Sequence, residues 1–94
     1  MALARVVQFD GVDSDRIQKL RQDIEGGERP EGLPATEFLL LHDAGAQTAV
    51  AIMFFDTEAD YQQGDATLGA MPADETPGNR LSVAQYDVAL RMTT

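Results

Sequence analysis

The stretch FLLLHDAGAQTAVAIMFFD, residues 38–56, decides the fold, because its two arms are apolar almost without a break. Three leucines occupy positions 39–41, and residues 50–55 are Val-Ala-Ile-Met-Phe-Phe. The turn residues between the arms predict a hairpin in which Gly45 takes a positive φ at the tip. A strand with one solvated face alternates apolar and polar residues. Both faces of this hairpin are therefore expected to be dry.

A strand and a helix are predicted before the hairpin. Residues 4–10, ARVVQFD, are typical of a short strand. Residues 13–27, DSDRIQKLRQDIEGG, predict a helix with one apolar stripe, capped by Asp13 or Ser14 and ended by a left-handed glycine at 26 or 27. The loop that follows, GERPEGLPA, contains two prolines and two glycines.

A second helix and a last strand are predicted after the hairpin. Asp56 or Thr57 caps this helix, Pro72 ends it, and the residues expected on its buried side are Tyr61, Gly64, Leu68 and Met71. RLSVAQYDVALRM, residues 80–92, predicts a long closing strand. The order β-α-β-β-α-β over one domain of 94 residues predicts a ferredoxin-like α+β fold. Right-handed crossovers place both helices on one face of a four-stranded antiparallel sheet.

The other face of that sheet has nothing left in the chain to cover it. An exposed apolar patch of several hundred Å² is rare on a soluble monomer. Two copies that pack their open sheet faces together bury it, and two-fold pairing is the commonest oligomer. We therefore expect a homodimer.

Composition excludes several classes of function. The net charge is −9, with 16 Asp and Glu against 7 Lys and Arg, which disfavours nucleic-acid binding. Cysteine is absent, so disulfides, thiolate catalysis and Cys-type zinc sites are excluded, and a cytoplasmic location is expected. The longest apolar run, AVAIMFF, is far shorter than the ~20 residues that span a bilayer, so no membrane partner is expected.

The element order, the chain length and the helix that begins directly after an aromatic strand, FFDTEADY, resemble the dimeric α/β barrel superfamily, which includes the antibiotic biosynthesis monooxygenase-like proteins. The resemblance implies a homodimeric barrel with a cleft between sheet and helices in each subunit. It also implies a cofactor-independent, monooxygenase-like activity. The heme-degrading branch, which uses an Asn, a Trp and a His, is disfavoured: the chain lacks Trp, and its single Asn, Asn79, precedes the last strand. No cofactor is expected.

His42 and Tyr86 are the candidate catalytic residues. His42 is the only histidine and shares a strand face with Phe38 and Leu40, where a partly desolvated imidazole can act as a general base. Alternatively, it is a solvated residue at a strand end. Tyr86 can orient a substrate oxygen or serve as an amphipathic core aromatic. No metal site is predicted, since His42 and Asp43 point to opposite faces of a strand.

Arg5, Gln8 and Phe54 are the candidate ligand-binding residues. Arg5 and Gln8 are the polar positions of the first strand and lie on opposite faces. Arg5 binds a ligand carboxylate or, alternatively, pairs with Asp87 or Glu37. The chain is thus either a binder or enzyme for a small apolar or aromatic molecule, or a non-catalytic dimerisation module. A pocket lined by His42 or Tyr86 favours the first.

Overall fold

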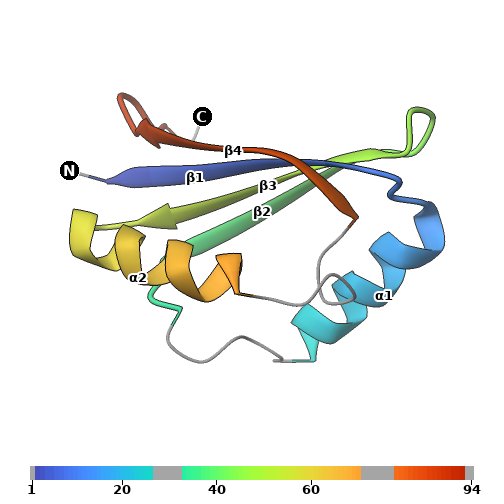
Figure 1. Ribbon diagram of the computed structural model, residues 1–94, viewed down its shortest axis with the longest axis horizontal. Helices are drawn as coiled ribbons and strands as arrows, with labels where there is room; N and C mark the ends of the chain where they lie inside the picture. Colours follow the sequence, from blue (N-terminus) through green and yellow to red (C-terminus); the bar gives the residue numbers. More distant parts are fainter. Residues whose placement is uncertain (1, 27–32, 71–77, 93–94) are drawn as a thin grey trace.

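The computed structural model describes residues 2–26, 33–70 and 78–92, which form four strands and two helices. In chain order these are β1 (Leu3–Asp10), α1 (Ser14–Glu25), β2 (Glu37–Asp43), β3 (Thr48–Phe55), α2 (Glu58–Gly69) and β4 (Asn79–Asp87). All neighbouring strands pair antiparallel in the order β2-β3-β1-β4, and both helices lie on the same side of the sheet (Figure 1). The predicted ferredoxin-like α+β fold is confirmed.

Each helix begins at the cap that its sequence predicts. The Asp13 carboxylate accepts a hydrogen bond from the backbone N–H of Arg16 at 2.8 Å. The Thr57 hydroxyl accepts one from the backbone N–H of Asp60 at 3.1 Å. These bonds satisfy first-turn N–H groups that have no partner within the helix.

Strand register sorts the side chains into two faces of the sheet. We call the side that carries the helices the helix face and the other side the open face. On the helix face lie Leu3, Arg5, Val7 and Phe9 of β1, Ala49, Ala51, Met53 and Phe55 of β3, and Phe38, Leu40 and His42 of β2. On the open face lie Ala4, Val6 and Gln8 of β1, Val50, Ile52 and Phe54 of β3, Leu39 and Leu41 of β2, and Ala84 and Tyr86 of β4. Both faces of β2 and β3 are apolar, as the sequence predicts.

The two helices pack very differently. α2 buries Tyr61, Gly64 and Leu68, and the Tyr61 ring meets the fully buried Phe55 edge-on at 5.5 Å between centroids. No residue of α1 is buried. Its apolar stripe, Ile17, Leu20 and Ile24, is only half-buried. Helix α2 therefore packs closely against the sheet, whereas the apolar residues of α1 stay partly exposed.

Two local predictions are wrong, and a third, the left-handed glycine at 26 or 27, is tested only at Gly26. The positive φ in the hairpin belongs to Gln47, at 56°, and not to Gly45, because loops of this length are commonly a turn followed by one left-handed residue. Gly26 ends α1 with helical angles (φ −75°), donating its N–H to the carbonyl of Gln22, so it is not left-handed. The last strand ends at Asp87 and not at residue 92, because Asp87 is paired with Leu3, the first residue of its neighbour β1. Gly27, Met71 and Pro72 lie outside the described residues.

The chain after β4 turns onto the open face. The N–H of Val88 donates to the carbonyl of Ala2 at 3.0 Å. Arg91 then forms an ion pair with Glu37, and its guanidinium lies 4.4 Å from the centre of the Phe54 ring. Leu39, Leu41 and Tyr86 on this face stay 41, 54 and 58 % exposed. No helix or strand within residues 2–26, 33–70 and 78–92 covers them.

Neither described helix is long and apolar enough to cross a membrane.

Candidate functional site

His42 lies on the helix face at the end of β2, with its ring held by the chain that leads into α1. Its Nε2 is 2.9 Å from the carbonyl oxygen of Val12, a fully buried residue. A carbonyl oxygen can only accept a hydrogen bond, so Nε2 carries a hydrogen. In the neutral ring Nδ1 is then the nitrogen without hydrogen, the one able to accept a proton.

A cavity of about 350 Å³ lies between His42 and α1. Its size falls within the range of small-molecule sites. Seven residues line it: Ser14, Ile17, Gln18, Arg21, Gln22, Glu25 and His42. Six of these side chains are polar, which differs from the mostly apolar wall expected for such a pocket. Ile17 is its apolar link to the core, because it packs against the cluster of Val7, Phe9, Val12 and Ala49.

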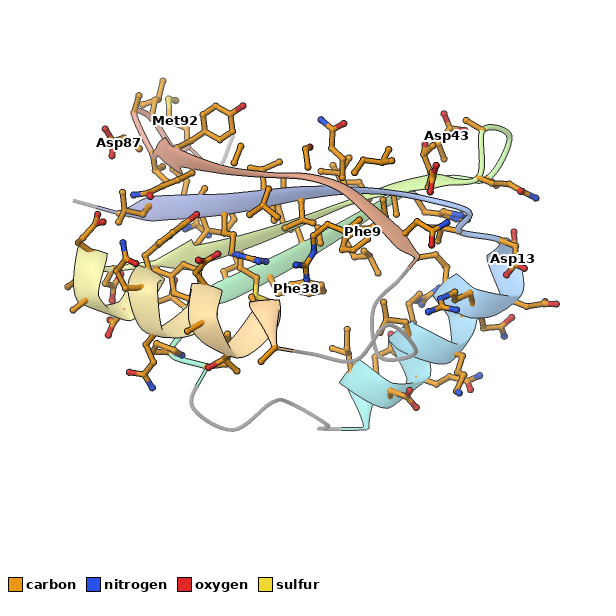
Figure 2. All side chains as sticks on the ribbon, in the orientation of Figure 1. Phe9, Asp13, Phe38, Asp43, Asp87 and Met92 are labelled. Carbon is orange, nitrogen blue, oxygen red and sulfur yellow. The ribbon has the colours of Figure 1, made fainter. Side chains whose placement is uncertain are left out.

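The helix face continues from this cavity toward α2 as a partly uncovered apolar surface. Phe38, Met53 and Arg5 stand opposite one another on adjacent strands, and Leu40 lies one position further along this face of β2. Phe38, Leu40 and Met53 are half-buried. Phe38 lies beneath the sheet in the space between the two helices (Figure 2). We use the name helix-side cleft for these residues together with the Ile17, Leu20 and Ile24 stripe of α1; the hollow that the structure shows among them is the one beside His42, which Ile17 lines.

Arg5 closes the α2 side of the helix-side cleft. It is only 5 % exposed, and its Nε donates to Oδ1 of Asp65 on α2 at 2.9 Å. The predicted alternatives, Asp87 and Glu37, are not its partners: Glu37 pairs with Arg91. Burial of a guanidinium is costly unless it is paired, which explains a carboxylate on the inner side of α2.

The remaining predicted site residues lie on the open face. Tyr86, Gln8 and Phe54 all belong to it by register, and Tyr86 is 58 % exposed. His42 and Tyr86 therefore lie on opposite sides of the sheet and do not meet in one subunit. Phe54 is covered by Arg91, while Arg5 and Gln8 take opposite faces, as predicted.

Sequence reasoning missed Asp65 and Arg80. The signal for Asp65 is its spacing, because it lies four residues after Tyr61 and three before Leu68, on the buried side of an amphipathic helix. A carboxylate at that place needs a cation beneath it. Arg80 has no such signal in the sequence. Its Nη2 donates to the carbonyl oxygen of Leu68 at 3.2 Å. A register irregularity between Gln8 and Phe9 pairs Arg80 with Phe9 and so sets its position.

Tyr61 is buried beside the ion pair of Arg5 and Asp65. Burial raises the pKa of its phenol, and the Asp65 carboxylate raises it further, while Arg5 opposes the shift. The hydroxyl consequently stays protonated at neutral pH.

We expect the raised pKa of Tyr61 to make the protein less stable in alkali. A phenol whose pKa is higher in the folded state than in the unfolded state contributes stability below the unfolded value, and this is lost as pH rises through the folded value. The free energy of unfolding should fall as pH increases above 10, the ordinary pKa of a tyrosine phenol. Urea denaturation at pH values from about 8 to 11 measures this change in the free energy of unfolding. Tyr61→Phe should flatten this dependence, and an unchanged slope in that variant would contradict the assignment.

No group of three or more His, Asp or Glu side chains among the described residues could hold a metal ion.

Comparison with known proteins gives the fold and not a family. No family model matches the chain, and no curated protein matches it. Among solved structures, that of Rv0793 from Mycobacterium tuberculosis matches with a TM-score of 0.57 over 100 % of both chains, at 12 % sequence identity. The chain shares its fold with Rv0793. At this identity the likeness to Rv0793 carries the small α+β architecture and no activity.

Proposed function

We propose that the protein is a homodimer that binds a small, largely apolar or aromatic molecule in the helix-side cleft of each subunit. The proposal agrees with the resemblance of the sequence to the dimeric α/β barrel proteins. The unequal packing of the two helices carries the proposal. α2 buries three residues against the sheet, whereas α1 buries none, so Phe38, Leu40 and Met53 keep accessible apolar surface.

A ligand in the helix-side cleft replaces the contacts that α1 does not make. Apolar area removed from water is worth about 25 cal/mol per Å². The half-buried residues of β2 and β3 belong to the face of the sheet on which α1 lies, and Ile17 of α1 and Leu40 of β2 pack against the same core cluster. A flat aromatic molecule between them would cover both walls, with the cavity beside His42 at one end.

His42 is the proton acceptor that such a site offers. Its Nδ1 can take a proton from an aromatic hydroxyl while Nε2 stays bound to Val12. That role fits a monooxygenase-like reaction without a cofactor. Because Tyr86 lies on the open face, it takes part only if a second copy brings it near a site.

The homodimer rests on the open face. Leu39, Leu41 and Tyr86 are exposed there, next to the half-buried Val50, Ile52 and Phe54. A second copy is the occupant with the same apolar surface, and a pair of such faces buries on the order of 800 Å² per subunit in ordinary interfaces. A non-catalytic dimerisation module is the second candidate function. The exposed apolar residues of the open face and the mostly polar lining of the His42 cavity favour it.

Titration with 2-naphthamide, a neutral aromatic compound, tests the binding proposal. We expect a dissociation constant on the order of 0.1 mM. Leu20→Trp should weaken binding at least about tenfold, because the larger side chain fills the helix-side cleft. Lys19→Trp is the matched control, since the exposed neighbouring position on α1 points away from the sheet.

Two outcomes decide against binding at this place. If 2-naphthamide does not bind at millimolar concentration, the dimerisation module is the better description. If Leu20→Trp and Lys19→Trp bind it equally well, the helix-side cleft is not the site. Backbone amide shifts in the NMR spectrum should report the contact at residues 38–42 and 53 of the wild type.

A further inference from the structure

We propose that the hollow beside His42 binds an uncharged, hydroxylated group, so that the ligand of the helix-side cleft carries a sugar or another polyol. This rests on the proposed function and adds a polar half to its apolar or aromatic ligand. The hollow measures about 350 Å³, a volume that accommodates a single sugar ring. Its polar lining carries the inference, because a site for a wholly apolar molecule has mostly apolar walls.

The polar lining comes from one face of α1. Gln18 and Gln22 lie one helical turn apart, with Cβ atoms about 5–6 Å from each other, and Ser14 lies one turn before them. Their side chains make no hydrogen bond within the part of the chain that the structure describes. An amide or a hydroxyl both donates and accepts hydrogen bonds. The group that complements three of them is one that also does both, as a sugar hydroxyl does.

His42 adds an acceptor of fixed direction. Its Nε2 is held by the carbonyl oxygen of Val12, which leaves Nδ1 of the neutral ring to accept. Among the described residues, the only fully buried side-chain nitrogen or oxygen without a partner in a buried or half-buried residue is Asp10 Oδ1. Nδ1 of the half-buried His42 is therefore accessible. A hydroxyl can donate to it, whereas a carboxylate or an ether oxygen cannot.

The two charged residues of the lining neutralise one another. Arg21 and Glu25 lie four residues apart on α1, and Nη2 of Arg21 donates to Oε1 of Glu25 at 3.5 Å. A charged ligand therefore meets no unpaired opposite charge among the residues that line the hollow. Ile17 is half-buried and supplies the one apolar side chain, against which the C–H groups of a sugar ring can pack. This lining suits an uncharged ring bearing hydroxyls.

The experiment compares 2-naphthyl β-D-glucopyranoside with 2-naphthamide, which share one ring system and differ in the sugar. By NMR titration, the wild type should bind the glucoside about tenfold more tightly, as expected for about two additional hydrogen bonds. The Nδ1 resonance of His42, the only histidine, should shift with the glucoside and not with naphthamide. The corresponding glucuronide, in which a carboxylate replaces the hydroxymethyl group, should bind at least about fivefold more weakly than the glucoside.

Substitution of the two glutamines tests the place of binding. The double variant Gln18→Ala, Gln22→Ala should lose the preference for the glucoside and bind naphthamide as the wild type does. Both positions are exposed and alanine favours the helix, so this variant is expected to fold. Gln62→Ala is the matched control, because it makes the same change at an exposed position of α2 that does not line the hollow. It should keep the preference.

Each contrary outcome has one meaning. Equal affinity of the wild type for glucoside and naphthamide overturns the polyol site and leaves the proposed function standing. Tighter binding of the glucuronide than of the glucoside also overturns it, because the hollow then selects a charge. A preference that survives in the double variant overturns the assignment to this hollow. Failure of all three compounds to bind the wild type overturns the proposed function and this inference with it.

Discussion

Ile52→Asp is expected to convert the homodimer that we propose to a monomer. Ile52 lies in the third strand at the middle of the open face, next to Val6 and Leu39 on the adjacent strands. In a two-fold dimer the substitution places two unpaired carboxylates in the interface, each costing several kcal/mol to desolvate. The dissociation constant should rise at least about a thousandfold. Sedimentation at micromolar concentration should give the mass of one chain, 10.2 kDa, and twice that mass for the wild type.

Lys19→Asp is the control for charge alone. It changes the net charge by two units at an exposed position of α1, on the opposite side of the sheet. This variant should remain a dimer. If it dissociates as Ile52→Asp does, repulsion between two acidic chains is responsible and the open face is not the interface. A monomeric wild type would remove the barrel proposal altogether.

Gly64→Ala is expected to destabilise the subunit by about 2 kcal/mol, in spite of the better helix propensity of alanine. A Cβ at this position would lie 2.4 Å from Cε1 and 2.5 Å from Cζ of Phe55. Phe55 is fully buried, so its ring has no free space into which to move. Helix α2 must therefore shift away from the sheet. The melting temperature should fall by about 10 °C for a chain of this size.

Gly69→Ala provides the matched control on the same helix. A Cβ there meets nothing within 4 Å. The substitution should leave the melting temperature unchanged or raise it slightly, because alanine loses less backbone entropy than glycine on folding. A drop as large as that of Gly64→Ala would show that glycine content, and not the contact with Phe55, governs the stability of α2.

The fold was predictable because each element carries its own signal. The caps at Asp13 and Thr57, the buried side of the second helix and the two apolar parities of β2 and β3 all follow from local spacing. The end of β4 was not predictable in this way. The apolar pattern runs on past Asp87, but the pairing of β4 with β1 ends at Leu3, beyond which the Val88 N–H still bonds the carbonyl of Ala2.

The candidate site was predicted only in part, because its contacts join segments far apart in the chain. The face of His42 follows from strand parity, whereas its bond to Val12 depends on how α1 enters beneath β2. Arg5 could be expected to need a carboxylate, but the choice of Asp65 depends on how α2 is seated on β1, which sequence spacing does not specify. His42 and Tyr86 lie on opposite faces because of the register of β4 on β1 and of β2 on β3, which the spacing of residues within each strand does not specify.

The place of β1 at the centre of the sheet has a consequence for how the chain folds. β1 leaves the ribosome before the other three strands, yet its partners are β3 and β4, and its residue Leu3 pairs with Phe55 and Asp87. Closing such distant contacts costs loop entropy before any pairing is gained. During synthesis the β2–β3 hairpin is therefore the first strand pairing able to form, β1 must wait for β3, and the sheet is completed only when β4 emerges. Until then β1 presents an unpaired apolar edge, and nascent chains are at their most exposed to aggregation in that interval.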